Sequence, residues 1–370
     1  MPFKRKFCIG TICLALVFAP FWSKAQNTAA PLTLAQLVQE ICATYLENPQ
    51  NYSLAVGIIE PEKVSHFYLG KTDNSSRQHP NENSVYPLGS FSKIYTVLLS
   101  LMLENEGKIH LDSSVYQYLP SNIRPKKIPA KPTVRQLLSH TANLSRFPFD
   151  APYAATNLRE YYKKYTKNQL FEQFLLQTAT EKTATYQYSH WAYGLWGACL
   201  ENISQQTYAQ LLQEKIAPAL ALTHTSTESQ NIIPLHNKNG QPVETWEFTA
   251  QEATMGINAS LPDVTKFVQM FLDSTQHLFP MAQKSLAIEA KTPIKKLWTT
   301  LGWHVFVQKK YPAVYTQSGN TDGSSCYIAF VPETQTGVVI LANSANKPDE
   351  IGISLLKAIQ PSKKHKNNKN

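Results

Sequence analysis

The segment Ser90-Phe91-Ser92-Lys93 has the residue types and spacing best suited to chemistry in this chain. It opens an apolar pattern at i, i+3, i+4 spacing, typical of a helix with one buried stripe, whose members are Ile94, Val97, Leu98, Leu101 and Met102. Residues three apart share a helix face, so the Lys93 amine can reach the Ser90 hydroxyl. An amine that takes the hydroxyl proton activates serine, and the free N–H groups at a helix start stabilise an oxyanion. The segment therefore predicts nucleophilic catalysis at Ser90.

The Ser-x-x-Lys pattern alone is weak evidence, because it occurs twice more, at Ser344–Lys347 and Ser354–Lys357. Both copies lie near the C-terminus, in surroundings that suggest no site. Two further segments single out Ser90.

The first of these segments is Tyr188-Ser189-His190, which precedes a predicted helix through Trp191, Leu195 and Cys199. A tyrosine close to two cationic amines can have its pKa lowered enough to act as a general base. The alternative is a buried structural tyrosine, since the chain contains 18 tyrosines.

The second segment, Gln317-Ser318-Gly319-Asn320, ends a predicted strand. A glycine in a strand often marks the close approach of another backbone or of a ligand. A backbone N–H here could pair with that of Ser90 to form an oxyanion hole. The alternative is an ordinary strand end that runs into the loop at 320–323.

Strand patterns occur near both ends of the chain, with helical patterns between them. We predict helices over 33–47, after Ser260-Leu-Pro-Asp263 and over 351–359, strands over 54–59, 64–69, 303–308, 314–317, 326–331 and 338–342, and a mostly helical stretch over about 108–265. The economical arrangement is one antiparallel sheet built from both ends and flanked by the terminal helices.

The predicted fold class is therefore a two-lobed α+β or α/β protein. The sheet lobe comprises about 26–107 and 290–360, and an inserted, mostly helical lobe comprises about 108–289. A cleft between two lobes is where a site is expected, and Ser90 lies near that junction.

The N-terminus reads as a secretory signal over residues 1–25. Its charged region is followed by an apolar run over 7–22 and by the small-residue site Ser23-Lys24-Ala25. We predict cleavage after Ala25 and a soluble periplasmic or secreted protein, with a retained N-terminal anchor as the alternative.

The net charge of +9 lies mainly at the two ends of the chain, at Lys4, Arg5, Lys6 and Lys24 and at Lys363, Lys364, Lys366 and Lys369. The body from 26 to 360 carries only about +1. A nucleic-acid-binding protein concentrates basic charge on its folded domain, so we predict no nucleic-acid partner. The tail over 361–370 is predicted to be disordered, with weak adhesion to an anionic surface as the alternative.

Three cysteines remain after the predicted cleavage: Cys42, Cys199 and Cys326. Each lies in an apolar segment, which favours buried free thiols, although one disulfide is open. No Cys/His spacing resembles a zinc site, and we expect no metal.

The three motifs, in this order and with these separations, resemble the penicilloyl-serine transferase superfamily of serine β-lactamases and penicillin-binding proteins. The most similar branch is that of class C β-lactamases and related serine hydrolases. Blocks around the motifs support the resemblance, namely Leu88-Gly-Ser-Phe-Ser-Lys93, Thr133-Val-Arg-Gln-Leu-Leu-Ser-His-Thr141, Tyr327-Ile-Ala-Phe-Val-Pro-Glu333 and Gly337-Val-Val-Ile-Leu-Ala-Asn343. The similarity covers about residues 33–360.

The resemblance implies a role for each motif residue. Ser90 is the acylated nucleophile, Lys93 accepts its proton, and Tyr188 is the general base that passes a proton to the leaving group. The backbone N–H groups of Ser90 and Asn320 form the oxyanion hole. The substrate-binding set is His190, Gln317, Ser318, Gly319 and Asn320, and no cofactor is needed.

Two departures from the family pattern bear on the substrate. His190 stands where asparagine is usual; a neutral imidazole could partly replace it, whereas a protonated one would repel Lys93. Gln317 stands where lysine or histidine is usual, and a neutral amide does not attract a substrate carboxylate as an ammonium does. The substrate is a β-lactam, a D-amino-acid peptide or an ester, of which the neutral ester is favoured. The alternative is a catalytically impaired ligand-binding or scaffold relative.

Overall fold

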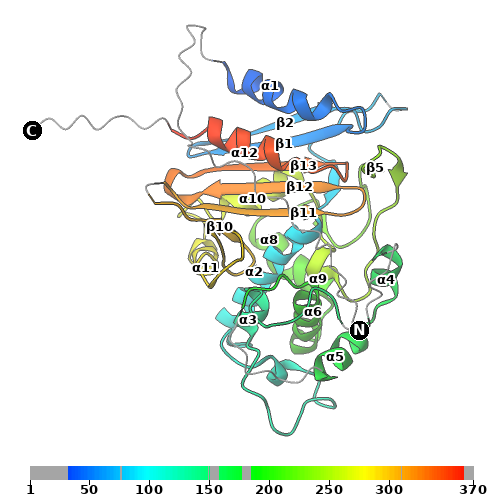
Figure 1. The fold of residues 1–370 in the computed structure, drawn as a ribbon, viewed down its shortest axis with the longest axis vertical. Coiled ribbons are helices and arrows are strands. Elements are labelled where there is room, and N and C mark those ends of the chain that lie inside the picture. The colour runs from blue at the N-terminus through cyan, green and yellow to red at the C-terminus, as the bar shows by residue number, and fades with distance from the viewer. Residues whose placement is uncertain are drawn as a thin grey trace, which may run out of the picture.

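The computed structural model describes residues 32–75, 77–148, 150, 158–176, 185–309 and 311–361. The predicted signal over 1–25 and all but the first residue of the predicted tail lie outside these ranges. Figure 1 shows a sheet with helices on both of its faces, and below it a mostly helical part. This arrangement confirms the predicted fold class.

The sheet is antiparallel in every pairing and has the strand order β2-β1-β13-β12-β11-β10-β9-β8. Its strands are β1 (Ser53–Glu60), β2 (Lys63–Gly70), β8 (Ala290–Lys291), β9 (Leu297–Thr299), β10 (His304–Phe306), β11 (Val314–Asn320), β12 (Ser325–Val331) and β13 (Thr336–Ala342). β1 pairs with β13, with Val56 opposite Ile340. The two ends of the chain therefore share one sheet, as predicted.

The central strands are buried on both faces, because helices cover each side. α1 (Leu34–Leu46) and α12 (Asp349–Ala358) cover one face, where Val56 and Ile340 belong to one apolar cluster. α10 (Leu261–Gln269) lies on the other face, against β1 and β13. The α10 residues fall inside the range predicted for the helical lobe, yet they pack on the sheet.

The helical part contains α2 (Ser92–Asn105), α3 (Val134–Leu138), α4 (Leu158–Lys164), α5 (Lys167–Leu176), α6 (His190–Ser204), α7 (Tyr208–Leu211), α8 (Ala217–Ala219), α9 (Glu252–Met255) and α11 (Phe279–Ser285). The prediction of a mostly helical stretch over about 108–265 missed several short strands within it. The structure also has short strands β3 (Val85–Pro87), β4 (Thr225–Ser226), β5 (Leu235–His236), β6 (Pro242–Val243) and β7 (Asn258–Ser260). Between α8 and α9 the chain lacks an apolar helical period, and brief strand pairing satisfies its backbone instead.

Two helix starts follow the capping chemistry of their sequences. Thr33 caps α1 in a reciprocal capping box with Gln36. Ser260 caps α10 by accepting from the Asp263 N–H, but the Asp263 carboxylate accepts from Thr223, His224 and Thr225 instead of closing the box.

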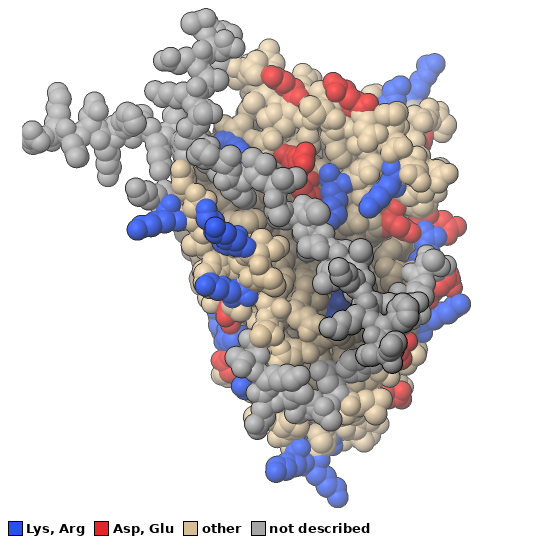
Figure 2. All heavy atoms as spheres, in the orientation of Figure 1, with Lys and Arg blue, Asp and Glu red and all other residues tan. Residues whose placement is uncertain are grey.

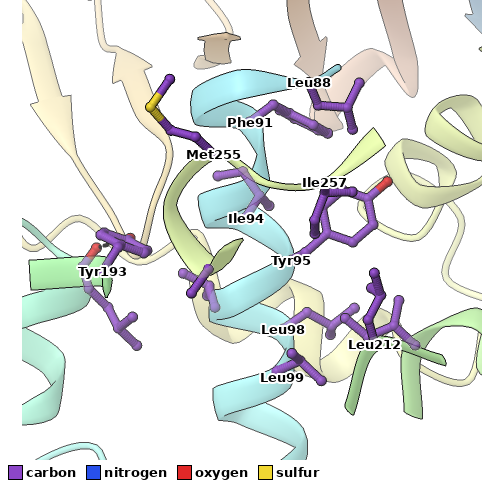
Figure 3. Packing of buried hydrophobic residues seen from close by; sticks show 14 of the residues in the cluster. Leu88, Phe91, Ile94, Tyr95, Leu98, Leu99, Tyr193, Leu212, Met255 and Ile257 are labelled. Atoms are coloured by element: carbon purple, nitrogen blue, oxygen red, sulfur yellow. Dashed lines mark hydrogen bonds between the residues drawn. The ribbon is translucent and has the colours of Figure 1, made fainter. Parts of the chain in front are cut away.

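The helix α2 is buried on every side and not along one stripe. Figure 3 shows Phe91, Ile94, Tyr95 and Leu98 among apolar neighbours from several elements. The polar side chains of α2 are buried as well, and Thr96 donates to the Ala253 carbonyl at 2.6 Å. A helix enclosed in this way holds its first turn in a fixed position.

Among the helices of the described ranges, none is long and apolar enough to cross a membrane. Basic and acidic side chains are interspersed on the face shown in Figure 2. The three cysteines named above are buried free thiols, as the sequence favoured.

Gly352 tests the seating of α12 on the sheet, because a Cβ at this position would lie 2.0 Å from the Tyr327 ring. We expect Gly352→Val to lower the free energy of unfolding by about 1–3 kcal/mol through overpacking. The matched Ser354→Val change on the exposed face of α12 should alter it by less than about 0.5 kcal/mol. Urea unfolding measures both, and equal effects would contradict the proposed packing.

Candidate active site

Ser90 and Lys93 lie in direct contact, as predicted. Ser90 itself precedes the α-helix, which begins at Ser92. Ser90 belongs to a 3-10 turn over Gly89–Phe91 that leads into α2. The Lys93 amine donates to the Ser90 hydroxyl at 3.3 Å and to the Thr254 carbonyl at 3.1 Å. Lys93 is fully buried, and burial, followed by the nearby charge of Arg146, holds its pKa well below the ordinary value. The amine is thus suited to accept a proton.

The other two Ser-x-x-Lys copies have different surroundings. Ser344 is buried and donates to Asn51 at 3.3 Å, and Ser354 is exposed on α12.

The turn that carries Ser90 packs tightly against the end of β11. A Cβ on Gly319 would lie 1.8 Å from the Leu88 carbonyl oxygen, and a Cβ on Gly89 would lie 2.7 Å from the Asn320 nitrogen. Gly89 also has a φ of +50°, which favours glycine. The close approach predicted from Gly319 is confirmed. It places the backbone of the turn over 89–91 against the backbone of Asn320.

Tyr188 lies next to Ser90 and near the side chains of Lys93 and Arg146. The Lys93 amine is 5.1 Å and the Arg146 guanidinium carbon 5.5 Å from the centroid of the Tyr188 ring. Burial raises the pKa of Tyr188, and contacts with Ser90, the Arg146 charge and Gln317 lower it by less, so the pKa is raised overall. The expected lowering does not occur, because the effect of burial on the pKa outweighs the Arg146 charge and the contacts with Ser90 and Gln317.

His140 fixes the segment that carries Tyr188. Its ring centroid is 4.4 Å from that of Tyr188, and its Nδ1 accepts from the Ser189 N–H at 3.1 Å. The Ser189 hydroxyl in turn accepts from the Ala192 N–H and caps α6. The sequence analysis did not single out His140, although it belongs to the block at 133–141.

His190 is buried and neutral. Its Nδ1 pairs with the Tyr162 hydroxyl at 3.0 Å, and its Nε2 has no hydrogen-bond partner among the described residues. Burial, followed by the charges of Lys93 and Arg146, lowers its pKa well below the ordinary value. Of the two states considered for His190, the structure favours the neutral imidazole.

Gln317 is held by a histidine that the sequence analysis missed. His304 Nδ1 pairs with Gln317 Oε1 at 3.3 Å, and His304 Nε2 pairs with the Tyr186 hydroxyl at 2.7 Å. Burial lowers the pKa of His304 to about 4, so this histidine is also neutral at physiological pH. The pairing of β10 with β11 brings it here, and that register was not evident from the sequence.

The side chains of two predicted site residues, Ser318 and Asn320, form hydrogen bonds within the fold. The Ser318 hydroxyl donates to the carboxylate of Asp349 in α12 at 3.0 Å, on the face of the sheet that α1 and α12 cover. The Asn320 amide donates to the carbonyls of Ser324 and Ala345, each at 3.1 Å. Their side chains hold the strand end in place.

Arg146 also lies next to Tyr188, and the sequence analysis did not predict it. Its side chain is exposed, and its carbonyl accepts from the N–H groups of His190 at 2.9 Å and Trp191 at 3.2 Å. The loop that carries Arg146 is thereby tied to the start of α6. The sequence feature that could have identified Arg146 is its position shortly after the block at 133–141. Within the described residues, no group of three or more His, Cys, Asp or Glu side chains could hold a metal.

A serine and a buried lysine paired at the start of an enclosed helix, next to the end of an interior strand of an antiparallel sheet, are typical of one class of serine hydrolases. The sequence model of the Beta-lactamase family matches residues 35–359. The chain therefore belongs to the Beta-lactamase family of serine hydrolases, as the motifs predicted.

Individual relatives agree with this assignment. A β-lactamase of Yersinia enterocolitica is 24% identical, with 94% of this chain and 97% of the relative covered. A D-alanyl-D-alanine-carboxypeptidase/endopeptidase of Escherichia coli is 23% identical, with 85% and 86% covered. The solved structure of a β-lactamase/D-alanine carboxypeptidase from Pseudomonas syringae matches with a TM-score of 0.76 at 20% identity, covering 89% of this chain and 99% of that one. A class C β-lactamase from Rhodobacter sphaeroides gives 0.74 at 20% identity, covering 86% and 97%.

Gly319 tests the contact between the Ser90 turn and β11. Gly319→Ala should lower kcat by about a hundredfold or more, because the new methyl displaces the Leu88 carbonyl and with it one oxyanion donor. Gly337→Ala is the matched control, since its Cβ would meet neighbours at 3.3 Å or beyond. Steady-state hydrolysis of a chromogenic substrate measures both variants. Unchanged kcat in Gly319→Ala would contradict the arrangement.

Proposed function

We propose that this chain is an exported serine acyl hydrolase that forms an acyl-Ser90 intermediate. The observation that carries the proposal is the contact between the buried Lys93 amine and the Ser90 hydroxyl, next to Tyr188 and the Asn320 backbone nitrogen. These groups match the four requirements of acyl transfer: a nucleophile, a proton acceptor, a proton donor and an oxyanion hole.

The first half of the proposed reaction forms the acyl-enzyme. Neutral Lys93 accepts the Ser90 hydroxyl proton while the oxygen attacks the substrate carbonyl carbon. The N–H groups of Ser90 and Asn320 stabilise the resulting oxyanion. The bond from the carbonyl carbon to the leaving group then breaks, and Tyr188 passes a proton to the leaving amine or alkoxide.

The second half releases the acyl group. A water molecule attacks the carbonyl carbon of the acyl-Ser90 ester while the Tyr188 phenolate takes a proton from the water, and the Lys93 ammonium protonates the Ser90 oxygen as it leaves. The raised pKa of Tyr188 suits a residue that holds its proton until a leaving group needs it.

We propose a β-lactam, a D-amino-acid peptide of the cell wall or an ester as the substrate. The names of the relatives, β-lactamase and D-alanyl-D-alanine-carboxypeptidase, support the first two classes. A signal at 1–25, cleaved after Ala25, would place the protein in the periplasm or outside the cell. The lobe boundaries near 108 and 289 and the basic tail over 361–370 belong to the same proposal.

The second candidate is a ligand-binding or scaffold relative with impaired catalysis. The replacement of two usual motif residues by His190 and Gln317, both neutral here, favours it. The two candidates differ in one observable: the enzyme is acylated at Ser90, whereas a binding protein leaves its ligand unmodified.

Intact mass after incubation with benzylpenicillin separates these functions. We expect either a persistent adduct of penicillin mass on Ser90 or hydrolysed penicillin without an adduct, depending on the rate of deacylation. Ser90→Ala should abolish both outcomes, whereas Ser354→Ala, in the exposed Ser-x-x-Lys copy, should change neither. Unmodified protein together with intact penicillin would reject the β-lactam substrate and favour an ester or a binding role.

The pH dependence of acylation tests the role of Lys93. Acylation should decline as the pH falls through the lowered pKa of Lys93, because the protonated amine cannot accept the Ser90 proton. The decline should therefore occur well below 10.5, the ordinary lysine value. Lys93→Arg, which stays cationic, should lose about 10²–10⁴-fold in acylation rate. Lys295→Arg, at an exposed position, should lose nothing, and full activity of Lys93→Arg would exclude the lysine as base.

A further inference from the structure

The motif residues leave the mouth of the site without an accessible cation. Gln317 is an amide, and His190 is neutral because it is buried. Lys93 is fully buried and donates to Ser90 and Thr254. None of these three side chains can present a positive charge to a substrate that approaches Tyr188.

Arg146 presents such a charge from another part of the fold. Its guanidinium carbon lies 5.5 Å from the Tyr188 ring centroid and 5.7 Å from that of Phe147. The side chain is exposed, but the main chain is fixed through the Arg146 carbonyl, which accepts from two N–H groups at the start of α6. The positive charge of Arg146 is close enough to the site to lower the pKa of four of its side chains, those of Lys93, His140, Tyr188 and His190.

Among the described residues, the guanidinium of Arg146 differs from those of two other arginines in its partners. Arg135 pairs with Asp112 and Glu289, and Arg159 pairs with Glu244. Within the described ranges no carboxylate pairs with Arg146 in this way. The acidic partner that fixes the other two arginines is replaced at Arg146 by the rings of Tyr188 and Phe147.

We propose that Arg146 binds a carboxylate of the substrate beside Tyr188 and so supplies the anion recognition that Gln317 cannot. This inference rests on the proposed function and specifies its substrate class: an acyl donor with a free carboxylate. A guanidinium offers two parallel N–H donors that match a carboxylate, and stacking on aromatic rings orients it. The preference for neutral esters expected from Gln317 alone is therefore reversed.

A matched pair of substrates isolates this recognition: benzylpenicillin and its methyl ester, which differ only in the carboxylate charge. Wild-type protein should be acylated by the acid with a higher second-order rate constant than by the ester. Arg146→Gln should lower the rate constant for the acid about tenfold to a hundredfold more than that for the ester. The change for the ester measures the loss of the Arg146 charge near Lys93 and Tyr188. Arg146→Lys should retain part of the preference for the acid over the ester, because lysine keeps the positive charge but lacks the two parallel N–H donors of a guanidinium.

Arg77→Gln is the matched control, because it removes the same charge from an exposed loop after the edge strand β2. It should change neither rate constant. An equal loss for acid and ester in Arg146→Gln, or no loss for either, would overturn the inference.

A binding measurement keeps the inference testable if acylation fails. In Ser90→Ala, calorimetry should show tighter binding of benzylpenicillin than of its ester, and the added Arg146→Gln change should remove the difference. Equal binding of both compounds to Ser90→Ala would reject the role of Arg146. A difference in binding with no acylation of the wild type would instead reject the proposed hydrolase while retaining the anion site.

Discussion

The close approach of the Ser90 turn to strand β11 is the contact on which the candidate site depends. It requires glycine on both sides, because side chains at Gly89 or Gly319 would collide with the backbone of the opposing segment. The turn continues directly into α2, which is enclosed by the helical part, and β11 lies within the sheet. This backbone contact therefore joins the helical part to the sheet and sets the spacing between the Ser90 turn and Asn320, on which the proposed oxyanion hole depends.

Burial determines the charges of the site more than the motif residues do. His140, His190 and His304 are all buried, and the pKa of each is lowered, so the polar lining is neutral near physiological pH. The same burial keeps the proton on Tyr188 and removes it more readily from Lys93. Burial thus shifts the pKa of the amine down and that of the phenol up, which suits the opposite proton-transfer roles proposed for Lys93 and Tyr188.

The sequence predicted the sheet and the Ser90–Lys93 contact because both depend on local pattern. Alternating and continuous apolar runs marked the central strands, and spacing of three residues placed the lysine on the serine. The sequence did not reveal His304 or Arg146, because each reaches the site through non-local pairing: one by the register of β10 with β11, the other by a loop tied to α6. The short strands between α8 and α9 were also missed, since two-residue pairings leave no periodicity.

The pairing of β1 with β13 has a consequence for the order in which the protein acquires its structure. Residues near 56 pair on one side with residues near 67 but on the other side with residues near 340, so the sheet cannot be completed until almost the whole chain has been made. Contacts this distant in sequence form late and slowly. During synthesis the first strands have only each other as a hairpin, and two strands alone are marginal in water. The sheet therefore reaches its full set of strand pairings only after β13 has been made.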